Sequence, residues 1–258
     1  IAYVGVHNGR MNPLTEPVYQ HAGGSNYSEF IGKSVAGYQA WFKVGGQKDF
    51  WHHWGNDAVE QDGTRWPRAY NHTFEIYPDL SLYQDADLYQ TGFADLGDGS
   101  PARLYNGQSR TVIAAHFAKM QQVGLDGVAV QRFLGAEMKS IADNPAAPLA
   151  IMRQQAEQTN RIFYICYDIT SNGLENTWDE LIRFDWVYNI EHNLKLTGSP
   201  AYATVNGKPV VEIWGIGFTD RPGDATRTKA LIEFLQSRGC YVIGGVPTYW
   251  REQRNDAK

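Results

Sequence analysis

SRTVIAAHFAKMQQVGLDGVAVQRF, residues 109–133, carries the strongest structural signal in this chain. Ser109 is a preferred N-cap residue, and apolar side chains then recur at helical spacing until Gly124, a typical helix stop. A run of small and β-branched residues follows directly and predicts a buried strand over residues 126–133. The segment therefore predicts a helix that leads at once into a strand, which is the repeating unit of a parallel α/β sheet.

The same alternation recurs on the C-terminal side. Thr177 and Glu180 form a capping-box pattern before an apolar run, and Asn206-Gly207 predicts a type I′ turn between two strands. The predicted elements are helices over residues 145–159, from 177 onward and from 224 to 239, and strands over 161–168, 202–205, 208–214 and 240–246.

The N-terminal side is less regular. Residues 1–33 are rich in Gly, Asn, Pro and Tyr and predict an irregular lead-in. A strand is predicted over residues 35–42 and a shorter one over 72–78, before a long stretch with little periodicity at 79–109.

Strands that alternate with helices predict a mostly parallel sheet, and about 250 residues is a typical length for a TIM-type barrel. We therefore predict an α/β fold, a (β/α)8 TIM-type barrel, with a lead-in at 1–33 and a single barrel domain at 34–258. Because the sequence stops at Lys258 soon after a strand, we expect either an incomplete barrel or final βα units that lie outside this chain.

Composition excludes several classes of partner. The 258 residues are 43% apolar and 20% charged with a net charge of -5, which is typical of a soluble globular protein. No dense Lys/Arg run supports nucleic-acid binding, and no apolar run is long enough to cross a membrane. We expect neither partner, and the oligomeric state stays open.

The chain is rich in aromatic residues, with 8 Trp, 15 Tyr and 11 Phe, many beside Gly, Asp, His or Asn. This pattern favours a carbohydrate-stacking surface, although the same rings also fill cores. Cys166 and Cys240 lie in apolar runs and are expected to be buried thiols. No GxSxG, P-loop, GxGxxG, HExxH or CxxC motif is present, so we expect no metal and no cofactor.

Polar residues at strand ends are the candidate site, because βα loops of a barrel converge at the carboxyl ends of its strands. Asp168 and Glu212 form the best carboxyl pair for glycoside hydrolysis, with Arg132 or Arg251 as a source of positive charge. The plain alternatives are that Asp168 caps its loop and that Glu212 only pairs with Arg251. The candidate substrate-binding residues are Gln39, Trp41, Trp51, His52, His53, Trp54, Asp79, Gln131, Arg132, Tyr167, Trp214, Tyr249, Trp250 and Arg251.

Several segments together resemble the glycoside hydrolase family 71/99-like proteins, which include endo-α-mannosidases and α-glucanases. They are GYQAWF at 37–42, WHHWG at 51–55, YPDLSLY at 77–83, the segment 111–133, GKPVVEIWGIGF at 207–218 and GVPTYWR at 245–251. The resemblance implies a (β/α)8 barrel, carboxylate-assisted attack on an α-linked polysaccharide or glycan, and a secreted or periplasmic protein.

The chain departs from the family pattern at the catalytic glutamates. A stretch resembling NEWHEG is absent, while Asp168 stands where the family carries an HYE-type strand end. The leading hypothesis is a glycosidase that uses Asp168 and Glu212. The alternatives are a non-catalytic carbohydrate-binding protein, and a barrel enzyme of other chemistry, such as a lyase or isomerase.

Overall fold

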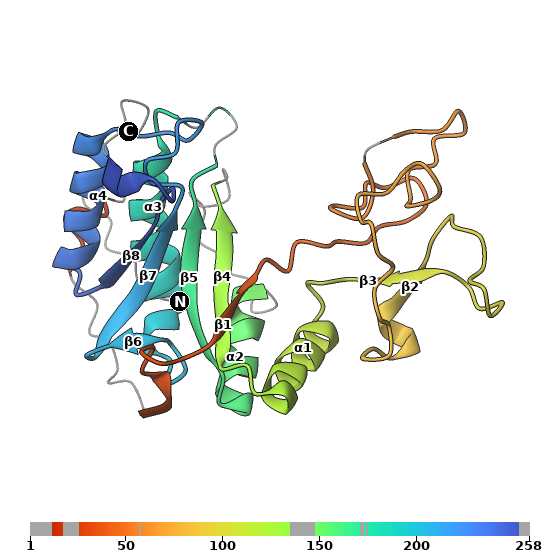
Figure 1. The fold of residues 1–258 in the computed structure, drawn as a ribbon, viewed down its shortest axis with the longest axis horizontal. Helices are drawn as coiled ribbons and strands as arrows, with labels where there is room; N and C mark the ends of the chain where they lie inside the picture. Colours follow the sequence, from red (N-terminus) through yellow and green to blue (C-terminus); the bar gives the residue numbers. More distant parts are fainter. Residues whose placement is uncertain are drawn as a thin grey trace. The chain divides into compact units, whose positions relative to one another are not determined.

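The computed structural model describes residues 12–17, 26–56, 58–134, 148–170, 173 and 175–252. The chain forms two compact units: unit 1 comprises residues 1–39 and 123–258, and unit 2 comprises residues 40–122 (Figure 1). Unit 2 is therefore an insertion within the sequence of unit 1. The division into a lead-in and one domain from residue 34 stays a prediction, because much of the lead-in lies outside the described residues.

Unit 1 is built on a six-stranded sheet. Its parallel strands are β1 (Val35–Tyr38), β4 (Gly127–Phe133), β5 (Ile162–Asp168), β7 (Lys208–Trp214) and β8 (Tyr241–Gly245), side by side in that order (Figure 1). Their order in space follows their order in the chain. This is the arrangement in the wall of a (β/α) barrel, whereas the order reverses in a doubly wound sheet.

The sheet is open in the part of the chain that the structure describes. There β1 pairs only with β4, and β8 pairs only with β7, so no ladder joins the two outer strands. The predicted mixed α/β architecture with a parallel sheet is confirmed. The closed eight-stranded barrel is not observed.

Helices cover one face of this sheet (Figure 1). Val130, Ile165 and Val211 are fully buried on that face, where β-branched side chains of adjacent strands pack in one row. The helices are α2 (Pro148–Thr159), α3 (Trp178–Phe184), the π-helix η4 (Asp185–Asn193) and α4 (Ala225–Ser237), with short 3-10 turns η1 (Asn26–Ser28), η5 (Leu196–Gly198) and η6 (Trp250–Glu252).

Helix starts follow the sequence signals only in part. The Asp224 carboxylate accepts a hydrogen bond from the Arg227 backbone N–H and caps α4 as its residue type predicts. Thr177 precedes α3, but its backbone is not extended and its side chain makes no capping hydrogen bond, so the predicted capping box does not form. The predicted start of the helix before β5, at residues 145–147, lies outside the described residues.

The predicted hairpin is confirmed. β6 (Thr204–Val205) runs antiparallel to β7. Both turn residues have positive φ, +52° at Asn206 and +75° at Gly207, as a type I′ turn requires.

Unit 2 has little regular structure. It contains η2 (Asp85–Asp87), a hairpin of β2 (Leu88–Gln90) with β3 (Arg103–Tyr105), and nearly all of α1 (Arg110–Val123). Helix α1 is found where the sequence predicts it. Residues 72–78 form bends and irregular backbone instead of the predicted strand. The Thr73 backbone N–H bonds to the Trp54 carbonyl and not to a neighbouring strand.

Large rings and one buried amide hold the loops of unit 2 together. Its described core is Trp51, Trp54 and Leu104, against which six partly buried apolar residues pack. The Asn71 side chain is buried, and its Nδ2 donates to three backbone carbonyl groups, at distances of 3.0 to 3.4 Å. Its Oδ1 accepts from the Asn56 backbone N–H at 2.9 Å, so one side chain joins several loop segments.

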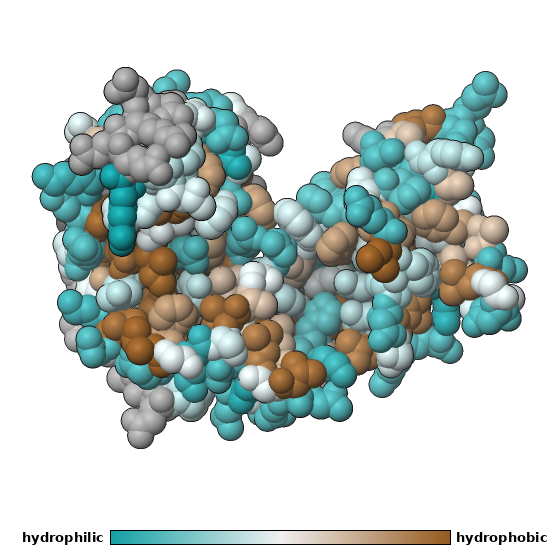
Figure 2. Space-filling model, viewed as in Figure 1, coloured by the Kyte–Doolittle hydropathy of each residue, from teal (hydrophilic) through white to brown (hydrophobic). Residues whose placement is uncertain are grey.

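Figure 2 shows hydrophobic residues among hydrophilic ones on the visible face of each unit. Isolated exposed apolar residues of this kind are usual on folded proteins. Among the described residues, no helix combines the length and apolar character needed to pass through a bilayer.

Candidate functional site

One row of side chains crosses the sheet of unit 1 on the face opposite the helices. The strand register pairs Gln131 with Cys166, and Cys166 with Glu212. Asp168 and Trp214 form the next row toward the carboxyl ends of the strands. Because side chains alternate between the faces of a sheet, all five residues share one face, which we call the pocket face.

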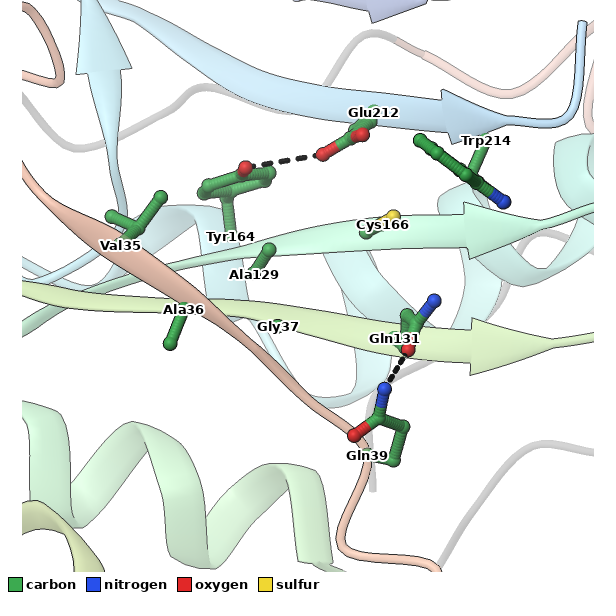
Figure 3. A pocket seen from close by; sticks show the side chains of 10 residues that line it. All are labelled: Val35, Ala36, Gly37, Gln39, Ala129, Gln131, Tyr164, Cys166, Glu212 and Trp214. Carbon is green, nitrogen blue, oxygen red and sulfur yellow. Dashed lines mark hydrogen bonds between the residues drawn. The ribbon is translucent and has the colours of Figure 1, made fainter. Parts of the chain in front are cut away.

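A hollow of about 320 Å³ lies on the pocket face (Figure 3). This volume is at the lower end of the usual range for small-molecule sites, about 300 to 1,000 Å³. Strands β1, β4, β5 and β7, with the residue after β1, supply its lining: Val35, Ala36, Gly37, Gln39, Ala129, Gln131, Tyr164, Cys166, Glu212 and Trp214.

Glu212 is the carboxyl group of this hollow. The Tyr164 hydroxyl donates a hydrogen bond to Glu212 Oε2 at 3.1 Å (Figure 3). Burial, and then the nearby charge of Glu212, raise the pKa of Tyr164 well above its usual value, so the hydroxyl keeps its proton and remains a donor. Tyr164 therefore holds the carboxylate in place.

Cys166 lies between Gln131 and Glu212 as a free, buried thiol. Burial, followed by the negative charge of Glu212, raises the pKa of Cys166 far above its usual value. Because the thiolate is the nucleophilic form of cysteine, a protonated Cys166 is a poor nucleophile at neutral pH. The carboxyl groups of Glu212 and Asp168 are thus the candidate acid–base groups on this face.

Asp168 is the second carboxyl group of the pocket face. Its Oδ1 accepts from the Thr170 backbone N–H at 2.9 Å and from the Thr170 hydroxyl at 2.6 Å, and the residue is 6% exposed. Asp168 lies on β5, the strand next to that of Glu212, and is displaced by two residues toward the carboxyl end of the strands. Ordinary strand geometry then places their Cα atoms about 8 Å apart.

Amide groups and an indole complete the hollow. Gln39 Nε2 donates to Gln131 Oε1, so the two amides are oriented by each other. Trp214 is 40% exposed, which leaves part of its ring accessible to a ligand. The ring packs against Gly245 on β8, where a side chain would collide with it.

Arg132 and Tyr167 lie on the helix-covered face and not in the hollow. Arg132 Nε donates to Asp185 Oδ2 at 2.7 Å, and the Tyr167 hydroxyl donates to the same oxygen at 2.8 Å. Asn189 Nδ2 also donates to Asp185, at 2.8 Å. Arg132 therefore neutralises a fully buried carboxylate of the π-helix, and Tyr167 donates a hydrogen bond to it. The sequence pattern instead predicts that both residues bind a sugar.

The residues after β8 do not line the hollow. Trp250 is 52% exposed, and the Arg251 guanidinium lies 4.9 Å from the centre of its ring. Tyr249, beside them, is half-buried. The alternative that Glu212 pairs with Arg251 is not what the structure shows, since Glu212 bonds to Tyr164.

In unit 2, two of the candidate indoles are core residues. Trp51 and Trp54 are 1% and 2% exposed, and their Nε1 atoms donate to the carbonyls of Gly46, at 3.0 Å, and Tyr105, at 2.9 Å. Their ring faces are therefore covered by protein, whereas the sequence led us to expect them to line a cleft.

The other candidates of unit 2 reach its surface. The Trp41 ring stacks on the His53 imidazole with centroids 3.9 Å apart, and His52 and Asp79 are exposed. Burial is the main cause that lowers the pKa of both His52 and His53. A binding role for these residues stays a prediction. Within the described residues, no three His, Cys, Asp or Glu side chains gather as metal ligands would.

Tyr164 and Cys166 were not among the sequence candidates. Both lie an even number of residues before Asp168 on β5, so the alternation of side chains along a strand places them on the same face. That signal was available in the sequence.

Comparisons with known proteins give similarities to solved structures. No family model matches the sequence, and no curated protein matches it. Among solved structures, a GH99 endo-alpha-mannosidase from Bacteroides thetaiotaomicron is similar over 70% of this chain and 44% of its own, with a TM-score of 0.41 and 13% sequence identity. The chain spans less than half the length of that structure.

Proposed function

We propose that this chain is a glycoside hydrolase that cleaves an α-linked polysaccharide or glycan with two carboxyl groups. The observation that carries the proposal is Glu212, which lines a ligand-sized hollow, is held by Tyr164 and has the exposed ring of Trp214 nearby. An oriented carboxyl group close to an accessible indole can bring acid–base chemistry to a sugar that stacks on the ring.

Asp168 is the proposed partner of Glu212. Glycosidases place their two carboxyl groups about 5 Å apart when the configuration is retained, and about 6.5 to 9.5 Å apart when it is inverted. Strand geometry places the two Cα atoms about 8 Å apart, and both side chains lie on the pocket face, so their carboxyl groups can reach either spacing. One carboxyl group would act as general acid, and the other as general base in inversion or as nucleophile in retention.

The remaining groups of the hollow suit a neutral polyhydroxylated substrate. The amides of Gln39 and Gln131 offer donors and acceptors to sugar hydroxyls, and Trp214 offers an apolar face. The α-linkage and an extracellular or periplasmic location are proposed from the sequence segments that resemble the family 71/99-like proteins.

A non-catalytic carbohydrate-binding protein is the second candidate, and one observation favours it. Asp168 is nearly buried, and Oδ1 is occupied by both hydrogen bonds from Thr170, as expected of a residue that only caps a loop. This candidate predicts affinity for glycans without release of products.

Replacement of Glu212 by Gln tests the proposal, because it removes the ionisable group and keeps the shape. We expect the rate of reducing-end release from soluble starch or α-mannan to fall about 10³-fold, which is typical for loss of a general acid or base. The melting temperature should stay within a few degrees, since the amide can still accept from Tyr164.

Glu233→Gln is the matched control, because Glu233 lies on the exposed surface of α4 in an i,i+4 pair with Lys229. Activity should be unchanged in this variant. Full activity of Glu212→Gln would overturn the proposal. Glycan binding by the unsubstituted chain with no product from either substrate would favour the binding protein, and NMR of the first-formed anomer would test inversion.

A further inference from the structure

Unit 2 carries a second hollow, of about 420 Å³. Its lining belongs to unit 2 alone, so it is separate from the pocket face of unit 1. Tyr77, Leu80, Tyr83 and Leu88 contribute apolar surface. The hollow is thus large enough for a small ring-shaped ligand and offers it apolar contacts.

The two tyrosine rings of this hollow are fixed at their hydroxyl ends. The Tyr77 hydroxyl accepts from the Arg103 backbone N–H at 2.7 Å and donates to the Arg103 carbonyl. The Tyr83 hydroxyl lies 2.7 Å from His116 Nε2, and its ring packs on Tyr105 with centroids 4.6 Å apart. Because these rings are held before any ligand arrives, binding costs little side-chain entropy.

Charged groups are part of the same lining. Arg103 Nη2 bonds to Asp85 Oδ1 at 2.9 Å, which neutralises that carboxylate. Asp79 is exposed, and its Oδ1 accepts from the Ser81 backbone N–H at 2.9 Å. Hydrogen bonds from Ser81 lower the pKa of Asp79, so the group is a carboxylate acceptor at neutral pH.

We propose that this hollow is a saccharide-binding site, in which a pyranose ring contacts the tyrosine rings while Asp79 and Arg103 bind its hydroxyl groups. A carboxylate accepts from sugar hydroxyls, and a guanidinium donates to them. A neutral ligand fits better than an organic cation, because Arg103 leaves only one unpaired carboxylate in the lining. The site holds glycan whether or not the chain hydrolyses it.

Affinity electrophoresis of the full chain tests the proposal, in native gels that contain soluble starch or α-mannan. We expect at least one polysaccharide to retard the chain. Asp79→Ala should weaken this binding about 10-fold, through loss of a charge-assisted hydrogen bond. Asp62→Ala is the control, because Asp62 is also exposed and accepts from a backbone N–H two residues later at 2.9 Å, but lies outside the hollow.

A second pair of variants keeps the two hollows distinct. Leu80→Trp fills the hollow of unit 2 and should reduce retardation. Trp214→Ala changes only the hollow of unit 1, so part of the retardation should remain. Adding Asp79→Ala to that variant should reduce the remaining retardation. Circular dichroism shows whether each variant is folded. Loss of all retardation in Trp214→Ala, together with normal retardation of Asp79→Ala, would overturn the proposal.

Two further outcomes would also overturn it. One is absence of retardation in both gels, and the other is an NMR response of the tyrosines to tetramethylammonium but not to maltose. Hydrolysis is measured separately, so a chain that is retarded through Asp79 but releases no sugar would support this site and count against the proposed enzyme.

Discussion

Unit 1 and unit 2 reach a stable interior by different means. Unit 1 buries rows of aliphatic side chains between a parallel sheet and its helices, and each strand is hydrogen-bonded to its neighbours in the sheet. Unit 2 joins loops around two tryptophans, one leucine and the amide of Asn71. A core made of a few large groups should be more sensitive to single substitutions, which the following predictions test.

The largest effect is expected inside unit 1, at the fully buried carboxylate of Asp185. Asp185→Ala removes the carboxylate that accepts from Arg132, Tyr167 and Asn189 and that pairs with the arginine charge. Loss of one partner of a buried ion pair costs about 3 to 5 kcal/mol, which urea unfolding would measure.

Asp220→Ala is the matched control for that experiment, since Asp220 makes an exposed pair with Arg221. Its free energy of unfolding should change by less than about 1 kcal/mol. Equal losses of unfolding free energy in the two variants would mean that the Asp185 network stabilises unit 1 no more than an exposed ion pair does.

Trp54→Ala should be nearly as damaging, and its damage should stay local. Removing this buried indole costs about 3 kcal/mol in lost burial and cavity formation. Hydrogen exchange should accelerate across residues 40–122, while strands β4, β5 and β7 stay protected. Trp250→Ala, at an exposed indole, should change neither region, and equal acceleration in both units would show that they unfold together.

Acid should destabilise unit 2 through His116. Burial lowers the pKa of His116 from 6.5 to about 4, so between these values the unfolded chain binds a proton that the folded chain does not. Stability is therefore complete above pH 6.5 and falls as the pH drops toward 4, by up to about 3 kcal/mol.

His116→Gln should make the melting temperature of unit 2 less dependent on pH over this range, because glutamine can still bond to Tyr83 without titrating. Thermal unfolding of both proteins at pH 7 and pH 4.5 gives the comparison. Identical shifts would assign the acid sensitivity to other groups.

The smallest effect is expected at a helix cap of unit 1. Asp224→Ala removes the acceptor for the Arg227 N–H, at 2.8 Å in the structure, and should cost about 1 kcal/mol. Asp224→Asn should restore most of it. A loss as large as that of Trp54→Ala would show that single contacts matter equally in both units.

The sequence predicted the regular unit far better than the irregular one. In unit 1, strand β4, strand β5 and the Asn206-Gly207 turn depend on short-range periodicity and turn chemistry, which local sequence contains. Helix α1 is the element of unit 2 that was predicted on the same basis. The strand expected at residues 72–78 did not form although its pattern alternates, because a strand also needs a neighbouring strand to pair with.

The candidate site was predicted in part, for a reason visible in consecutive residues. Gln131 and Arg132, like Tyr167 and Asp168, were chosen together, yet neighbours on a strand point to opposite faces. The register between β5 and β7 places Glu212 beside Cys166, where it accepts a hydrogen bond from Tyr164. Local sequence does not contain this register, so these contacts could not be predicted from it.

Asn71 has a consequence for production of the protein. Asn71-His72-Thr73 matches the acceptor sequence for N-linked glycosylation, but the acceptor nitrogen is buried and already donates to the backbone. A host that attaches oligosaccharides before folding would replace those hydrogen bonds with a bulky glycan and prevent unit 2 from folding. Expression in a glycosylating host should therefore yield misfolded protein unless Thr73 is first replaced by Ala.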